Sequence, residues 1–148
     1  MSQERRPEPP DPPLSTPEAN RRLANRWFQE VWNERKPETV DALFAQNGVG
    51  HTESGDQSPA EFLAAREVFL ESFPDMRVEI EDTAADGDHV VVRWNATATH
   101  LGNGLGMAAT GIAVAFHGMT WLTFRDGAVV EGWDSWNIGG LLEKLKAG

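Results

Sequence analysis

The hydrophobic period of this chain changes halfway along, and that change restricts the fold more than any single motif. Apolar residues first recur at helical spacing in three stretches, which begin at Pro17, Pro37 and Pro59. Alternating apolar and polar residues then form four stretches, at 76–86, 89–100, 111–124 and 128–137. Helices that precede antiparallel strands are typical of an α+β domain. We therefore expect a curved antiparallel sheet wrapped around three N-terminal helices, as a cone with an internal pocket.

Local signals mark where these elements begin and reverse. Thr16 precedes a proline and suits an N-cap, and Ser58 with Glu61 forms a capping box at the third helix. A brief extended segment is expected at 49–52. Turn pairs separate the strands at Asp86-Gly87 and Asp126-Gly127.

The 148 residues divide into a tail and one domain. Residues 1–16 are dense in proline and charge and cannot bury enough apolar surface to offset the entropy of ordering, so we expect a disordered tail. Residues 17–148 are then a single domain.

Composition excludes several classes of partner and chemistry. The net charge of −10 argues against nucleic acid and against an anionic membrane surface. No apolar run approaches the roughly 20 residues of a membrane span, and there is neither a secretion signal nor a cysteine, so we expect a cytoplasmic protein. The chain has no tyrosine to supply a hydroxyl that polarises a carbonyl. The histidines have no ligand spacing, so no metal site is predicted.

The last predicted strand carries the most informative residue, Asp134. Period-two geometry places Val130, Gly132, Asp134 and Trp136 on one face, with Glu131, Trp133 and Ser135 on the other. If the first face is buried, desolvation raises the pKa of the Asp134 carboxyl. A carboxyl of raised pKa suits proton transfer to or from carbon.

The turn at 126–127 leaves two registers open for this hairpin. A two-residue turn places Met119 opposite Asp134 and His117 on its face. A three-residue turn with a bulged glycine places Gly118 opposite, brings Phe116 and Thr120 onto that face and removes His117. We favour the bulged turn.

The strand at 89–100 contributes a second wall. One of its faces is apolar until His100, which we expect at a polar rim of the pocket, with Trp94 available to stack on a flat ligand. The glycine run 102–106 opens no helix and has no lysine, so it is interpreted as a flexible lip over the pocket rather than a phosphate loop. The tryptophans at 27, 32 and 121 are expected to be packing residues, and Trp133 a candidate for a subunit interface.

The order and spacing of several short motifs then resemble one family, from about Asn20 to Lys146. These motifs are Glu30-Val31-Trp32-Asn33, Phe73-Pro74-Asp75, Gly87 to Trp94 with Thr99-His100, Ala109-Thr110-Gly111, Phe124-Arg125-Asp126-Gly127 and Glu131-Gly132-Trp133-Asp134. Together they resemble the SnoaL-like polyketide cyclases, within the cystatin-like fold shared with nuclear transport factor two. The resemblance implies a homodimeric or homotetrameric α+β cone without metal or organic cofactor. It further implies that an aspartate, here Asp134, is the acid/base for intramolecular aldol ring closure.

The residues and the resemblance together predict a site and three functions. Asp134 is the candidate catalytic residue, and the candidate substrate-binding residues are His51, Trp94, His100, Phe116, Thr120 and Trp136. The first function is a cofactor-independent cyclase or isomerase for an apolar aromatic or polycyclic substrate, and the second a non-catalytic binder of such a molecule. The third is a hydrolase or hydratase, disfavoured because Trp94 and Ala96 stand where the similar limonene epoxide hydrolases carry an arginine and a second aspartate.

Overall fold

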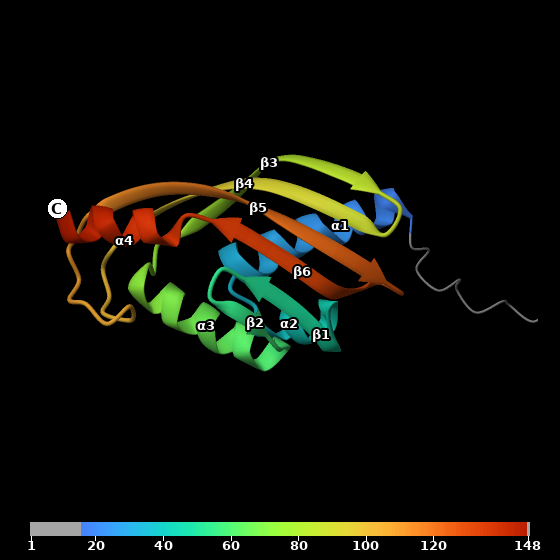
Figure 1. Cartoon of the computed structure of the whole chain (residues 1–148), viewed down its shortest axis with the longest axis horizontal. Coiled ribbons are helices and arrows are strands. Elements are labelled where there is room, and N and C mark those ends of the chain that lie inside the picture. Colours follow the sequence, from blue (N-terminus) through green and yellow to red (C-terminus); the bar gives the residue numbers. More distant parts are fainter. Residues whose placement is uncertain (1–15, 148) are drawn as a thin grey trace, which may run out of the picture.

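The computed structural model describes residues 16–147. Apart from Thr16, the expected tail lies outside these residues. Four α-helices, a π-helical turn and six strands follow one another along the chain (Figure 1). In order they are α1 Pro17–Trp27, the π-helix η1 Phe28–Asn33, α2 Pro37–Leu43, β1 Phe44–Thr52, β2 Gly55–Gln57, α3 Pro59–Ser72, β3 Arg77–Asp86, β4 His89–Thr99, β5 Ala113–Arg125, β6 Ala128–Trp136 and α4 Ile138–Ala147.

The helices begin at Pro17, Pro37 and Pro59 as predicted, and side chains cap the first and the third. The Thr16 hydroxyl accepts a hydrogen bond from the Ala19 backbone N–H at 3.1 Å. The Ser58 hydroxyl accepts from the Glu61 N–H at 3.2 Å, and the Glu61 carboxylate accepts from the Ser58 N–H at 3.0 Å, which completes the capping box. These bonds satisfy N–H groups that a helix terminus leaves free.

The six strands form one mixed sheet in the order β2-β1-β6-β5-β4-β3. All neighbouring strands are antiparallel except β1 and β6, which are parallel, so the expectation of a purely antiparallel sheet is wrong at this one pair. The extended segment expected at 49–52 is the end of a longer strand, which begins at Phe44. Parallel strands need a long connection, and here α3 with β3, β4 and β5 supplies it.

A fourth helix, α4, was not expected. Asn137 caps it, with its side-chain oxygen accepting from the Gly140 N–H at 2.9 Å, and Leu141 and Leu145 are buried. The pair Gly139-Gly140 in its first turn has low helix propensity and hid this element in the sequence.

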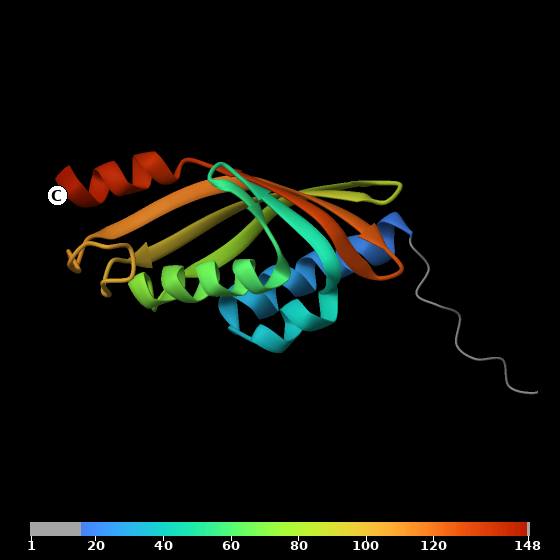
Figure 2. The same ribbon diagram turned by 60° about the horizontal axis from the view of Figure 1, so that its bottom comes forward.

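The helices before β3 lie on one face of the curved sheet, with most of the core between them (Figure 2). On β4 the predicted apolar face is buried at every position: Val90, Val92, Trp94, Ala96 and Ala98. Within residues 16–147, no helix covers the other face of the central strands in this way (Figure 2). We call these the inner and outer faces.

The β5–β6 hairpin matches neither register that the sequence allowed. Its turn has two residues, Asp126 and Gly127, with φ of 51° and 78°. A bulge at Val130 then adds one residue to β6, and the shifted register sets Thr120 opposite Asp134. The bulge also puts Val129, rather than the expected Val130, in the wall of the cavity described below.

Candidate active site

A cavity of about 420 Å³ lies between the inner face of the sheet and the helices. Every α-helix except α2, the π-helical turn η1 and all six strands contribute residues to its wall, and most of the lining side chains are aromatic or aliphatic. The charged residues in the wall are Glu53, Arg66 and Asp134. A mostly apolar cavity with few polar groups is typical of a small-molecule site.

Asp134 enters this wall because the alternation of β6 turns it to the inner face. Its carboxylate oxygen Oδ1 accepts a hydrogen bond of 2.6 Å from the hydroxyl of Thr120, which lies opposite on β5. The indole Nε1–H of Trp94, on β4, donates to that same hydroxyl at 3.0 Å. Three adjacent strands thus supply a connected chain of three polar groups.

The environment of Asp134 favours its protonated form. Burial raises the pKa of the carboxyl above its ordinary value, and the bond from Thr120 offsets part of that effect. No charged side chain of residues 16–147 contributes to the shift. The residue is nevertheless partly accessible, and it lines the cavity. A carboxyl of raised pKa that a ligand can reach is suited to take up and return a proton.

Aromatic rings surround this end of the cavity. Phe116 and Trp136 stack with centroids 5.1 Å apart, and Phe69 of α3 meets Trp136 edge-on at 5.6 Å. Gly118 allows this packing, because a Cβ there would lie 2.5 Å from Trp94 Cζ2 and 2.7 Å from Trp136 Cβ. The predicted residues Trp94, Phe116, Thr120 and Trp136 therefore all lie in the wall with Asp134.

Arg66 is a wall residue that the sequence analysis missed. It is only 2% exposed; its Nε donates to the Val31 carbonyl at 2.9 Å, and its Nη1 donates to Glu67 at 2.6 Å. The sequence could have indicated this position, because Phe62, Arg66 and Phe69 recur at helical spacing and therefore share one face of α3. Its bond to Val31 joins α3 to the π-helical turn.

His51 does not lie in the cavity wall, contrary to its predicted substrate-binding role. It pairs with Trp133 across the parallel β1–β6 ladder and stacks on that outward-facing indole, with centroids 3.9 Å apart. Its ring nitrogens meet Asp56 at 2.7 Å and Glu131 at 2.9 Å. These two carboxylates raise the pKa of His51, and the histidine lowers that of Glu131. The parallel β1–β6 pairing, which was not expected, explains the difference.

His100 is also absent from the cavity wall, although it lies on the predicted face of the β4 segment. It is 0% exposed, because the loop after β4 folds back over it. Its Nδ1 accepts from the Thr110 N–H at 3.1 Å, and its backbone bonds to Gly111 and Ile112. The residue expected at a polar rim instead closes the base of the loop.

The loop itself contributes Leu105 to the cavity wall. The N–H groups of Leu101 and Gly102 donate to the Ser72 carbonyl at 3.0 and 3.1 Å. A Cβ at Gly102 would overlap the Glu71 carbonyl, so glycine permits this close approach to the end of α3.

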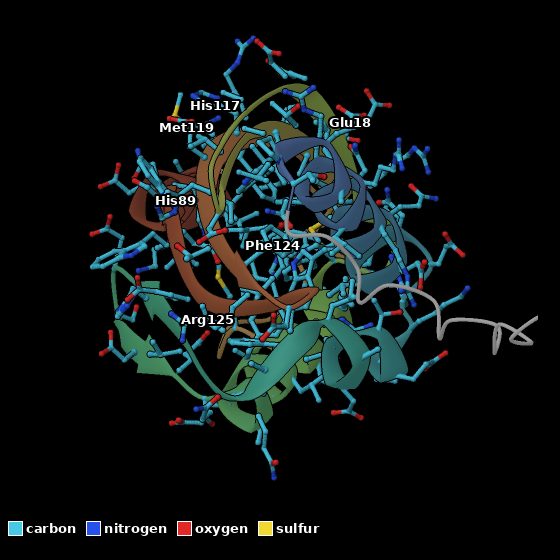
Figure 3. The ribbon with its side chains drawn as sticks, turned by 90° about the vertical axis from the view of Figure 1, so that its right-hand side faces the viewer. Glu18, His89, His117, Met119, Phe124 and Arg125 are labelled. Atoms are coloured by element: carbon cyan, nitrogen blue, oxygen red, sulfur yellow. The ribbon has the colours of Figure 1, made fainter. Side chains whose placement is uncertain are left out.

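The outer face carries a different set of side chains. In Figure 3, His89, His117 and Met119 project away from the interior, whereas Phe124 points into it. His117 therefore does not share the face of Asp134. Trp121, expected in the core, is 47% exposed beside Trp133, its cross-strand partner.

Two further features of residues 16–147 bear on the kind of site. No group of three or more His, Asp and Glu residues there is placed to hold a metal ion. None of the helices in this part of the chain has the length and apolarity to cross a membrane.

Comparison with known proteins shows which family this chain resembles. The family model described as SnoaL-like polyketide cyclase matches residues 22–145. AclR, a candidate hydroxylase from Streptomyces galilaeus, is 30% identical, with 90% of this chain and 84% of that chain covered and a TM-score of 0.80. A candidate polyketide cyclase from Acidithiobacillus ferrooxidans is 25% identical, with 90% and 97% covered and a TM-score of 0.75.

A third structure supports the fold alone. It is a SnoaL-like candidate cyclase from Jannaschia sp. CCS1, 22% identical, with 99% of both chains covered and a TM-score of 0.81. The chain has no significant match among curated protein sequences.

Proposed function

Because the chain belongs to the SnoaL-like polyketide cyclase family, we propose that it is a cofactor-independent enzyme that moves a proton to and from carbon in an apolar aromatic or polycyclic substrate. The reaction is ring closure of the aldol type or an isomerisation, with Asp134 as general acid/base. The observation that carries the proposal is the Asp134 carboxyl, which has a raised pKa and lies among aromatic side chains of the cavity wall.

The proposed ring closure needs one group that first accepts and then returns a proton. The Asp134 carboxylate removes a proton from a carbon between carbonyl groups, and the resulting enolate carbon attacks another carbonyl carbon of the same molecule. One C–C bond forms, the attacked C=O π bond becomes an alkoxide, and the Asp134 carboxyl returns its proton to that oxygen. Holding both ends of one molecule in a shaped cavity supplies much of the rate enhancement.

The surroundings of Asp134 also limit the substrate class. The two hydrogen-bond donors beside it are engaged, Trp94 with Thr120 and Thr120 with Asp134 itself. Neither is free to stabilise an enolate oxygen. The proposed substrate therefore carries its own activation, as a 1,3-dicarbonyl or a carbonyl conjugated to an aromatic ring, which delocalises the charge internally.

Deuterium exchange tests the proton-transfer half of this proposal without the natural substrate. The probe is 2-carbomethoxy-1-tetralone, a bicyclic β-keto ester, and mass spectrometry follows exchange at its acidic carbon in D2O. We expect the wild type to accelerate exchange and Asp134→Asn to lose about a hundredfold or more of that acceleration. Quenching of tryptophan fluorescence by the probe checks that the variant still binds it.

Glu131→Gln is the matched control, because it removes a carboxylate from the outer face of the same strand. Its exchange rate should equal that of the wild type. Binding without acceleration by the wild type would instead support a non-catalytic binding protein, and full exchange activity in Asp134→Asn would remove the acid/base role.

Hydroxylation is a second candidate function, favoured by the 30% identity to AclR. The two reactions differ in mass balance, because hydroxylation adds an oxygen atom and cyclisation does not. Hydroxylation would also require molecular oxygen and a two-electron reductant in the assay, whereas cyclisation requires neither. Mass spectrometry of products from an aromatic polyketide-like substrate distinguishes them. Epoxide hydrolysis is less well supported, since it needs a second polar group aimed at the same point and Trp94 is already bonded to Thr120.

We also propose that the protein assembles as a homodimer or homotetramer through its outer face. Met119, Trp121 and Trp133 are 53%, 47% and 53% exposed and lie on the adjacent strands β5 and β6. Such a concentration of exposed apolar side chains is typical of an interface. Light scattering should give a multiple of the 16.3 kDa chain mass, reduced by Trp133→Glu. A monomeric wild type would contradict this.

A further inference from the structure

Trp94 and Thr120 were predicted to bind substrate, but their hydrogen bonds are directed elsewhere. The indole of Trp94 can only donate, and its Nε1–H points at Thr120 Oγ1 at 3.0 Å. The Thr120 oxygen is therefore the acceptor of that bond. Its own hydrogen remains for the Asp134 carboxylate, whose Oδ1 lies 2.6 Å away.

We infer that Trp94 and Thr120 are positioning residues for Asp134, and that together they assign the transferable proton to the carboxyl oxygen Oδ2. This inference rests on the proposed acid/base role of Asp134. It states which group donates each hydrogen bond in the chain. It also states which of the two carboxyl oxygens of Asp134 exchanges the proton with substrate.

The assignment follows from the number of hydrogens available. A proton on Oδ1 would force the Thr120 hydroxyl to turn its hydrogen away from Asp134. Thr120 is 5% exposed, and Asp134 is the one side chain among residues 16–147 to which its hydroxyl donates a hydrogen bond. A buried hydroxyl without an acceptor is unfavourable, so the proton goes to Oδ2.

Oδ2 is also the oxygen that a ligand can reach. It has no hydrogen-bond partner within residues 16–147, yet it is not among the sealed, unpartnered polar atoms of that region, which are Asn20 Oδ1, Arg21 Nε and His100 Nε2. Since Asp134 lines the cavity, the free oxygen is available to substrate while Thr120 holds the other. The hydroxyl bond also stabilises the carboxylate form and thereby lowers the pKa of Asp134.

The test measures the Asp134 carboxyl in the free protein, without substrate. Carbon-13 NMR of aspartate-labelled protein gives its pKa, with the signal identified by its loss in Asp134→Asn. We expect Thr120→Val to raise the pKa by about one, a tenfold change in the acid dissociation constant, and Thr120→Ser to restore it. Trp94→Phe should shift it in the same direction by less, and the outer-face variant His117→Gln should leave it unchanged.

Infrared difference spectra locate the proton directly. With the proton on Oδ2, the C=O group of Oδ1 accepts the Thr120 hydrogen bond, which lowers its stretching frequency. Thr120→Val should therefore raise the carbonyl frequency of protonated Asp134, and Thr120→Ser should not. Thermal unfolding and tryptophan fluorescence confirm that each variant is folded.

An unchanged pKa and carbonyl frequency in Thr120→Val, or a serine variant that behaves like the valine variant, would overturn the inference. Its failure is distinguishable from failure of the proposed function. If Thr120→Val shifts the pKa but Asp134→Asn keeps full exchange activity, the hydrogen-bond chain stands and the enzyme function falls. If only Asp134→Asn has an effect, the acid/base role stands without the positioning residues.

Discussion

Strand β6 carries two carboxylates three residues apart, and the two faces of the sheet give them opposite properties. On the inner face, Asp134 has apolar neighbours and one hydroxyl, and burial raises its pKa. On the outer face, Glu131 bonds to His51 at 2.9 Å, and that bond lowers its pKa. The comparison shows that the surroundings of a carboxyl, rather than its residue type or its strand, make it a candidate acid/base.

The same contrast holds for the aromatic residues. The inner-face rings Trp94, Phe116 and Trp136 contact one another, and Phe69 of α3 packs edge-on against Phe116 and Trp136. The outer-face rings Trp121 and Trp133 are about half exposed. Side chains of one chemical class therefore line a cavity on one side of the sheet and an exposed surface on the other.

The largest predicted effect tests how tightly the inner face is packed. In Gly118→Ala the new methyl group would meet Trp94, Trp136 and the Ser135 carbonyl at 2.5–2.8 Å, so backbone as well as side chains must move. We expect a loss of about 1–3 kcal/mol in the free energy of unfolding, the usual range for overpacking, and weaker probe binding. Denaturant unfolding measures the first and fluorescence quenching the second.

Gly132→Ala is the matched control for this prediction. A Cβ there lies 3.4 Å from its nearest neighbour, Leu122 Cδ2, which is ordinary contact or nearly so. Its stability should change by less than that of Gly118→Ala. If the two substitutions lowered the free energy of unfolding equally, the tight packing around Gly118 would not be what holds the aromatic rings in place.

The second prediction concerns the stability cost of the buried carboxyl. Because the pKa of Asp134 is raised in the folded protein, its contribution to stability is fully present below the ordinary value of 3.8 and is lost as pH rises through the folded pKa. Asparagine does not ionise, so the Asp134→Asn variant does not lose this stability as the pH rises. Its Tm should therefore rise relative to the wild type with increasing pH, by roughly 3 °C at pH 8, and converge with it near pH 3.5. A variant less stable than the wild type at pH 8 would contradict the raised pKa.

The smallest predicted effect lies on the outer face and has a different pH window. Because the pKa of His51 is raised in the folded protein, its contribution to stability is fully present below pH 6.5 and is lost as pH rises through the folded pKa. Because the pKa of Glu131 is lowered, its contribution is present above pH 4.5 and is lost as pH falls through the folded pKa. The pair should therefore contribute most near pH 6. His51→Gln should lower Tm by about 1 °C there, since exposed pairs contribute little, and by nothing at pH 10.

This variant also separates the two faces functionally. His51→Gln should leave deuterium exchange of the probe unchanged, because His51 is outside the cavity wall. A large loss of exchange would show that the two faces are coupled and that the comparison fails.

Much of the fold could be predicted from local patterns. The capping residues Thr16 and Ser58 and the alternation along β4 are local, and each element they predict is present. The parallel pairing of β1 with β6 depends on strands far apart in the sequence, so no local pattern reports it. The helix α4 was missed because Gly139-Gly140 weakens its signal.

The candidate site was predictable only where one strand alternates regularly. Asp134 and Trp136 share a face by period two, and that placement was independent of the hairpin register. Placing Thr120 opposite Asp134 required the bulge at Val130, which no residue type signals. His51 was misplaced because its environment depends on the parallel ladder, and His100 because a loop covers it.

The pH dependence of deuterium exchange tests the central claim most directly, because it reports the ionisation of the group that takes the proton. The account predicts that the wild-type rate rises with pH through an inflection above 3.8, the ordinary pKa of an aspartate, and then reaches a plateau, and that Asp134→Asn abolishes this inflection. The same inflection in Asp134→Asn, or a wild-type rate that shows no inflection at all, would contradict it.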